Sequence, residues 1–257
     1  MRQYDGYLFD LDGTIYLGEE LIPGAADVVA KLRERGARVQ FLSNKPVARR
    51  DSYATKLTKL GIPCTPDDVV NSPLASARYL AQEHAGERVM AMGEAPLRQE
   101  LLEAGVELTD APDETDIVLA SWDREMCWPQ MDAAHQALLN GARFFATNPD
   151  TVCPLEGGRT VPDCGAIIAY LEASTGRSLE VMIGKPSRII TEMALATIDL
   201  TADQCLMIGD RLGTDIAMGR TAGLDTALVL TGVTTREDLE GADVEPTWVL
   251  GSVAEIE

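Results

Sequence analysis

The stretch Asp10-Leu11-Asp12-Gly13-Thr14 lies near the start of the chain and directly follows the apolar run Tyr7-Leu8-Phe9. A short apolar run bounded by turn residues is typical of a strand buried in a parallel sheet. Two carboxylates therefore leave the end of that strand, and Gly13 lets the chain turn sharply. One carboxylate can attack phosphorus, while the other protonates the leaving oxygen and later activates water. We expect Asp10 to be the nucleophile, because it is held directly by the strand, and Asp12 to be the acid and base.

Strands and helices alternate along both ends of the chain. The sequence predicts strands at 38–42, 181–183, 205–208 and 226–230, and helices at 24–35, 47–60, 187–198 and 215–222. Such alternation is typical of an α/β fold with a parallel, doubly wound sheet. We therefore expect a Rossmann-like core that contains the strand before Asp10.

The middle of the chain has an α/β pattern of its own. Apolar strands are expected at 88–93, 117–120 and 143–146, with helices at 95–104 and 130–140. About a hundred residues between two halves of one sheet indicate an inserted domain. The sequence predicts a core made of residues 1–71 and 181–257, with a smaller α/β domain inserted at 72–180.

Polar residues follow four of the expected core strands. In an open parallel sheet, ligands bind beyond the carboxyl ends of the strands, where these residues gather. Ser43 and Asn44 offer a hydroxyl and an amide to phosphate oxygens, and Lys185 can neutralise both a phosphoryl group and a carboxylate nucleophile. Each motif alone has an ordinary alternative: the aspartates as helix caps, Ser-Asn as a turn, and the lysine as a solvated charge.

The stretch Gly209-Asp210-Arg211-Leu212-Gly213-Thr214-Asp215 adds further acids after a buried strand. Carboxylate oxygens suit Mg²⁺, which usually takes one or two protein carboxylates together with substrate oxygen and water. Asp10 and Asp210 can supply the carboxylates, and the backbone carbonyl of Asp12 can face the same ion. We expect Thr214 and Asp215 beside these ligands, where Asp215 either orders a metal-bound water or caps the following helix.

The composition excludes several classes of partner and site. The chain has 257 residues and a formal net charge of −19, which disfavours nucleic acid and anionic membranes as partners. The acidic surface fits either a salty cytoplasm or a lysine-poor genome. Two histidines, both expected on helix surfaces, argue against an imidazole-rich zinc site and a Ser-His-Asp hydrolase. Five scattered cysteines and the lack of a long apolar run predict free thiols and a cytoplasmic protein.

The four motifs, in this order and spacing, resemble the haloacid dehalogenase superfamily of phosphohydrolases over essentially the whole chain. The insertion between Ser43 and Lys185 resembles the subgroup with a C2 cap, known as NagD-like or para-nitrophenylphosphatase-like. Two further stretches are similar to that subgroup: Ala146-Thr147-Asn148-Pro149-Asp150 and Gly184-Lys185-Pro186.

The resemblance implies an aspartyl-phosphate intermediate at Asp10, with Asp12 as general acid and base. It implies that Ser43 and Lys185 contact the phosphate, and that Mg²⁺ binds at Asp10, the Asp12 carbonyl and Asp210. The implied substrate is a small phosphorylated metabolite, such as a sugar phosphate, a phosphoglycolate-like compound or an aryl phosphate. A homodimer formed through the cap stays open.

Two departures from the family pattern concern substrate contacts. Ser43-Asn44-Lys45 stands where relatives often have Thr-Asn-Asn, so Lys45 either adds positive charge near the substrate or points to solvent. Residues 121–128, SWDREMCW, replace a stretch that usually carries a Phe or Tyr pair. This stretch is the expected specificity loop, in which Trp122 and Trp128 either line the site or belong to the core of the inserted domain. The remaining candidates for substrate binding are Gly13, Asn44, Asp123, Arg124, Asn148 and Asp150.

Three functions compete with hydrolysis of a phosphate ester. Dehalogenation needs an aspartate nucleophile but neither a second acid nor a metal, so Asp12 and Asp210 weigh against it. Phosphoryl transfer to another substrate, as in a mutase, uses the same residues and stays open. A non-catalytic regulatory protein is disfavoured, because every catalytic motif residue is present.

Overall fold

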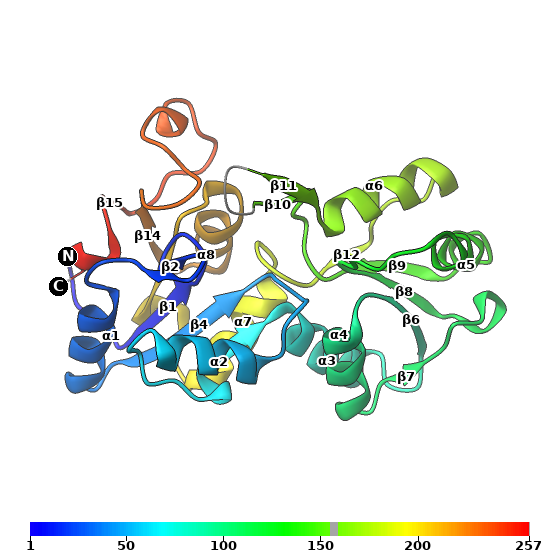
Figure 1. Cartoon of the computed structure of the whole chain (residues 1–257), viewed down its shortest axis with the longest axis horizontal. Helices are drawn as coiled ribbons and strands as arrows, with labels where there is room; N and C mark the ends of the chain where they lie inside the picture. The colour runs from blue at the N-terminus through cyan, green and yellow to red at the C-terminus, as the bar shows by residue number, and fades with distance from the viewer. Residues whose placement is uncertain (155–158, 257) are drawn as a thin grey trace. The chain divides into compact units, whose positions relative to one another are not determined.

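The computed structural model describes residues 1–154 and 159–256 (Figure 1). These residues form two compact units. The first unit contains residues 1–43, 50–70 and 185–257, and the second contains residues 44–49 and 71–184. The α/β class expected from the sequence is confirmed, because helices alternate with parallel strands in both units.

The first unit is built on a six-stranded sheet in the order β15-β14-β13-β1-β4-β5. Its strands are β1 (Gly6–Asp10), β4 (Arg38–Ser43), β5 (Val69–Asn71), β13 (Cys205–Gly209), β14 (Asp225–Val229) and β15 (Trp248–Leu250). Its helices are α1 (Ala25–Glu34), α2 (Arg50–Lys59), α7 (Arg188–Ile198) and α8 (Ala217–Ala222), and a small hairpin joins β2 (Tyr16–Leu17) to β3 (Glu20–Leu21).

Strand β1 lies inside the sheet because all of its residues are apolar or small up to its last position, and all are buried. Phe9 stacks near Tyr7, with ring centroids 6.4 Å apart, and packs against Phe41 of β4 at 6.2 Å. In the parallel registers, Phe9 lies opposite Ile208 of β13, and Asp10 lies opposite Leu42. The ends of β1, β4 and β13 therefore coincide at one edge of the sheet.

The second unit has a five-stranded parallel sheet in the order β12-β9-β8-β6-β7. Its strands are β6 (Arg88–Met92), β7 (Glu107–Leu108), β8 (Ile117–Ala120), β9 (Arg143–Ala146) and β12 (Val181–Met182), and β10 (Val152–Pro154) pairs with β11 (Thr160–Pro162). Its helices are α3 (Ser72–Glu83), α4 (Ala95–Glu103), α5 (Trp128–Leu139) and α6 (Cys164–Thr175). Val118, Leu138, Phe144 and Leu171 are fully buried in its core.

The structure corrects the expected membership of one strand. Residues 181–183 were expected in the core sheet, but β12 pairs with β9 of the second unit, where Val181 lies opposite Phe145. The second unit also contains residues 44–49, so its limits differ from the expected insertion at 72–180. The sequence of a short apolar strand does not show which sheet the strand joins, because that depends on its pairing partner.

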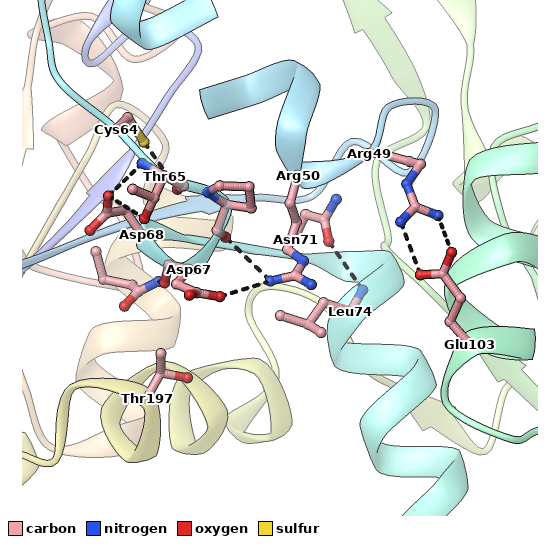
Figure 2. Close-up of polar contacts among 12 residues, drawn as sticks. Arg49, Arg50, Cys64, Thr65, Asp67, Asp68, Asn71, Leu74, Glu103 and Thr197 are labelled. Carbon is pink, nitrogen blue, oxygen red and sulfur yellow. Dashed lines mark hydrogen bonds and ion pairs between the residues drawn. The ribbon is translucent and has the colours of Figure 1, made fainter. Parts of the chain in front are cut away.

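Two neighbouring arginines lie where the chain passes from one unit to the other (Figure 2). Arg49 belongs to the second unit and binds both carboxylate oxygens of Glu103 on α4, each at 2.9 Å. Arg50 begins α2 in the first unit, where it donates to the Pro66 carbonyl at 3.3 Å and pairs with Asp67 at 3.8 Å. Each arginine is thus anchored inside its own unit.

Helix boundaries differ from expectation mainly at their starts. The helix expected at 47–60 begins at Arg50, and the one expected at 215–222 begins at Ala217, after a π-helical turn, η5 (Leu212–Ile216). The expectation that both histidines lie on helix surfaces is wrong for His84, which is buried against the rings of Tyr79 and Phe145. All five cysteines are free, as expected. None of the helices within the described ranges is long and apolar enough to cross a membrane.

Candidate active site

Three carboxylates and one lysine meet at the carboxyl edge of the first unit's sheet. Asp10 ends β1, Asp210 follows β13, and Asp215 lies in η5. One oxygen from each of the three carboxylates lies within 4.8 Å of the others, and all three residues are buried. The parallel register of β1 and β13 brings Asp10 and Asp210 to the same edge, as expected from the strand ends, and η5 adds Asp215.

Lys185 is the cation that holds this cluster together. Its ammonium donates to Oδ1 of Asp10 and, at 2.7 Å, to Oδ1 of Asp215. Only 3% of Lys185 is exposed, so the ammonium depends on these partners instead of water. Burial alone would lower the pKa of Lys185, but the charges of Asp10 and Asp215 outweigh burial and raise it. The lysine therefore stays charged.

The carboxylates themselves are held in an environment that disfavours their charge. Burial raises the pKa of Asp10, Lys185 opposes this, and the charges of Asp215 and Asp210 raise it further. Burial and the charge of Asp215 raise the pKa of Asp210 to about 6. Three acids around one ammonium leave the cluster with a surplus of negative charge, which a bound cation would relieve.

The donor set of this cluster fits Mg²⁺. Oδ1 of Asp210 is buried and has no hydrogen-bond partner, which is costly unless another group uses that oxygen. Both oxygens of Asp215 are already engaged, one by Lys185 and one by the backbone N–H of Arg211 at 3.1 Å. Asp10 and Asp210 are therefore better placed than Asp215 to supply hard oxygen ligands.

The remaining residues of the first motif lie around this cluster. Asp12 is partly exposed and forms an isolated β-bridge with Tyr16. Gly13 has a φ of 90°, and a Cβ at this position would come within 2.6 Å of Oδ2 of Asp210. Glycine thus serves both the left-handed turn and the close approach to Asp210. Thr214 lies in η5, next to Asp215.

Ser43 ends β4 and is buried, with its hydroxyl 3.4 Å from the hydroxyl of Tyr53. It lies at the same edge of the sheet as Asp10, since the two strands are neighbours in parallel register. The next two residues of this motif, Asn44 and Lys45, belong to the second unit.

A second polar cluster lies wholly within the second unit. The Asn44 amide donates to Oδ2 of Asp150 at 3.1 Å, and the amide of Asn148 donates to the same oxygen at 3.1 Å. Asn148 also donates to Oδ1 of Asp163 at 2.9 Å. Burial raises the pKa of Asp163, while Asn148 and the charge of Lys45 are among the groups that lower it. Four residues that the sequence singled out therefore belong to this cluster: Asn44, Lys45, Asn148 and Asp150.

Asp163 was missed in the sequence. It is the N-cap of α6 and accepts from the backbone N–H of Cys164 at 2.6 Å. An aspartate just before a helix is a common cap, so its position gives a signal for the helix start. Nothing in the sequence shows that the same side chain also binds Asn148.

The expected specificity loop has one buried and one exposed tryptophan, and an exposed arginine between them pairs with α4's N-cap, Glu94. Trp122 is 6% exposed and belongs to the apolar core of the second unit. Of the two positions that the sequence allowed for this residue, the structure has the one in the core. Arg124 binds both oxygens of Glu94, at 2.6 and 2.7 Å, and its guanidinium lies 5.7 Å from the Trp122 ring. Asp123 accepts from the backbone N–H of Glu125 at 2.8 Å. Trp128, by contrast, is 70% exposed.

The ion pairs of Lys185 lead to a prediction about stability. Replacing Lys185 with methionine leaves Asp10 and Asp215 buried without their cation, so the free energy of unfolding should fall by about 3–5 kcal/mol. Urea denaturation in the presence of EDTA measures this loss. Lys59→Met, at an exposed position of α2, is the matched control and should change stability by less than about 0.5 kcal/mol. Equal unfolding midpoints for the two variants would contradict the proposed charge balance.

Two family models match parts of this chain. Residues 7–107 match the model of the haloacid dehalogenase-like hydrolases, and residues 182–256 match a second model, of HAD-like hydrolases. The 5'-nucleotidase YutF of Bacillus subtilis is 38% identical over 99% of this chain and 98% of that protein. The acid sugar phosphatase of Staphylococcus saprophyticus is 37% identical over 100% of this chain and 98% of that protein.

Solved structures give the same result. A p-nitrophenyl phosphatase from Archaeoglobus fulgidus has a TM-score of 0.91 at 36% identity and covers 98% of this chain and 97% of its own. NagD from E. coli K-12 has a TM-score of 0.91 at 33% identity and covers 100% of this chain and 99% of its own. The chain therefore belongs to the haloacid dehalogenase-like hydrolases, close to NagD and the p-nitrophenylphosphatases, and it is a phosphatase of that family.

Proposed function

We propose that this phosphatase is Mg²⁺-dependent and hydrolyses a small phosphate monoester through an aspartyl-phosphate at Asp10. One observation carries the proposal: Asp10, at the end of the central strand, is bound by Lys185 and clusters with Asp210, whose Oδ1 is buried without a partner. Phosphoryl transfer to an aspartate requires a nucleophile, a cation and an oxygen ligand for a metal ion, and all three lie at one edge of the sheet.

In this mechanism an oxygen of Asp10 attacks phosphorus, and the bond to the ester oxygen breaks. Asp12 gives its proton to that leaving oxygen, so an alcohol departs and the phosphoryl group stays on Asp10. Asp12 then removes a proton from water, which attacks the same phosphorus and releases inorganic phosphate and free Asp10. Mg²⁺ would be held by Asp10, the Asp12 carbonyl and Asp210, and would neutralise charge on the phosphoryl oxygens.

Lys185 has two functions in this mechanism. Its ammonium fixes one oxygen of Asp10, so the carboxylate enters the reaction in a defined orientation. The same charge, with the hydroxyl of Ser43, stabilises the phosphoryl group as negative charge builds on its oxygens. A local cation is needed, because a chain with net charge −19 otherwise repels an anionic ester.

For the substrate we propose a sugar phosphate or another small phosphorylated metabolite. The names of the relatives include a 5'-nucleotidase, an acid sugar phosphatase and a p-nitrophenyl phosphatase, which supports this class of substrate. We propose that the second unit is a C2-type cap. Its loop 121–128 and the cluster around Asn148 and Asp150 would select the organic part of the ester.

The role of Asp10 is tested by Asp10→Asn, assayed on a panel of p-nitrophenyl phosphate, hexose phosphates and nucleoside monophosphates. The variant should lose at least about a thousandfold in kcat on every ester that the wild type hydrolyses, because an amide is a poor nucleophile of nearly the same shape. Asp27→Asn, on the exposed face of α1, should keep wild-type activity. Retained turnover in Asp10→Asn would reject the aspartyl-phosphate.

The role of the metal is tested by chelation. Treatment with EDTA should abolish activity, and added Mg²⁺ should restore it. Ca²⁺ should restore it poorly, because it prefers more ligands and a looser geometry that misplaces the in-line attack. Full activity of the chelator-treated enzyme would rule out the proposed site at Asp10 and Asp210.

The role of the loop is tested by Arg124→Ala. The change removes the bidentate pair with Glu94 and should alter kcat/KM several-fold for some esters of the panel relative to others, with Mg²⁺ affinity unchanged. Arg88→Ala removes a comparable pair, with Glu114 at 2.9 Å, and serves as the control that leaves the ratios unchanged. A uniform loss over all esters would point to a structural role for the loop.

A further inference from the structure

The loop that follows β14 wraps around the carboxyl group of Asp210. The backbone N–H of Val233 donates to Oδ2 of Asp210 at 2.7 Å, and the N–H of Thr234 donates to the Asp210 carbonyl at 3.2 Å. Residues 231–234, Thr-Gly-Val-Thr, therefore contact both the side chain and the backbone of this aspartate. They follow a core strand, as the other motifs do, but none of them carries a charge.

Gly232 lies directly against the same carboxylate. A Cβ at this position would come within 2.0 Å of Oδ2 and 2.5 Å of Cγ of Asp210. Gly232 is not among the glycines with positive φ, so its backbone conformation is open to other residues. The requirement for glycine here is therefore one of space, because any side chain would displace Asp210.

Gly13 contacts the carboxylate as well, and a hydrogen bond joins it to the loop. The hydroxyl of Thr231 donates to the carbonyl of Gly13 at 2.6 Å. A Cβ on Gly13 would also collide with Oδ2 of Asp210. The loop and the first motif thus enclose one oxygen of Asp210, whereas Oδ1 of the same carboxylate is buried and has no partner.

We propose that residues 231–234 position Asp210 for metal binding. The Val233 N–H and the two glycines hold Oδ2, and this orientation presents Oδ1 to Mg²⁺. The proposal rests on the metal site of the proposed function, and it adds Gly232 and Thr231 as positioning residues. A carboxylate that is fixed before the ion arrives loses little freedom on binding, and outer partners of metal ligands commonly change affinity by about 10–100-fold.

The first test is the affinity of the chelator-treated full-length protein for Mg²⁺ and Mn²⁺, measured by calorimetry without substrate. Gly232→Ala should weaken binding by about tenfold or more, because the methyl group moves the carboxylate. Gly213→Ala is the matched control, since a Cβ on Gly213 meets nothing within 4 Å, and it should bind as the wild type does. Wild-type affinity in Gly232→Ala would overturn the proposal.

A second pair of variants covers the case in which Gly232→Ala does not fold. Thr231→Val removes the hydroxyl that binds Gly13 at nearly constant volume, while Thr231→Ser keeps it. Metal binding should be several-fold weaker in the valine variant and restored in the serine variant, and equal binding by the two would overturn the proposal. The wild type distinguishes failure of the positioning proposal from failure of the proposed metal dependence. If the wild type binds neither Mg²⁺ nor Mn²⁺, the metal dependence itself fails.

Activity gives an independent signature of positioning. In Gly232→Ala, the Mg²⁺ concentration that gives half-maximal rate should rise with the dissociation constant, and most of kcat should return at saturating Mg²⁺. A loss of kcat that no Mg²⁺ concentration restores, with unchanged metal affinity, would indicate general damage to the site and would contradict the proposal.

Discussion

The ion pair of Lys185 with Asp10 and Asp215 is the constraint on which the rest of the site depends. The three side chains are almost inaccessible to water, so none of them can be charged unless its partners are in place. Burying this group costs stability, which is a common property of functional sites. Asp10 is held at the end of β1 and Asp215 in η5, and Lys185 meets both acids at hydrogen-bond distance.

The positions of Asp10, Ser43 and Asp210 could be predicted because they follow from local pattern and one rule of parallel sheets. An apolar run followed by a polar residue marks a strand end, and neighbouring parallel strands end at the same edge. Asp10, Ser43 and Asp210 were placed correctly in this way. The rule failed for the strand before Lys185. Its apolar pattern was read correctly, but β12 joins the sheet of the second unit, since pattern alone does not specify a pairing partner.

The parts that the sequence did not reveal depend on backbone groups and on missing side chains. The loop at 231–234 binds Asp210 through two N–H groups and an absent Cβ, and such features have no characteristic side chain. Asp163 could be recognised as a helix cap but not as the partner of Asn148. Trp122 illustrates the reverse case: a large aromatic residue in a candidate loop packs into the core, where burial of its ring stabilises the second unit.

Asp10 and Asp210 are held in a similar way, each through one carboxylate oxygen. Lys185 neutralises one oxygen of Asp10, and Val233 stabilises one oxygen of Asp210, so each carboxylate is held at one end. The cluster still has more negative than positive charge, and its free oxygen at Asp210 is cut off from water. A divalent cation would neutralise the surplus charge and use the free oxygen, and it would stabilise the folded chain more as its concentration rises above its dissociation constant. The residues proposed to prepare the site for the ion would thus make the stability of the first unit depend on it.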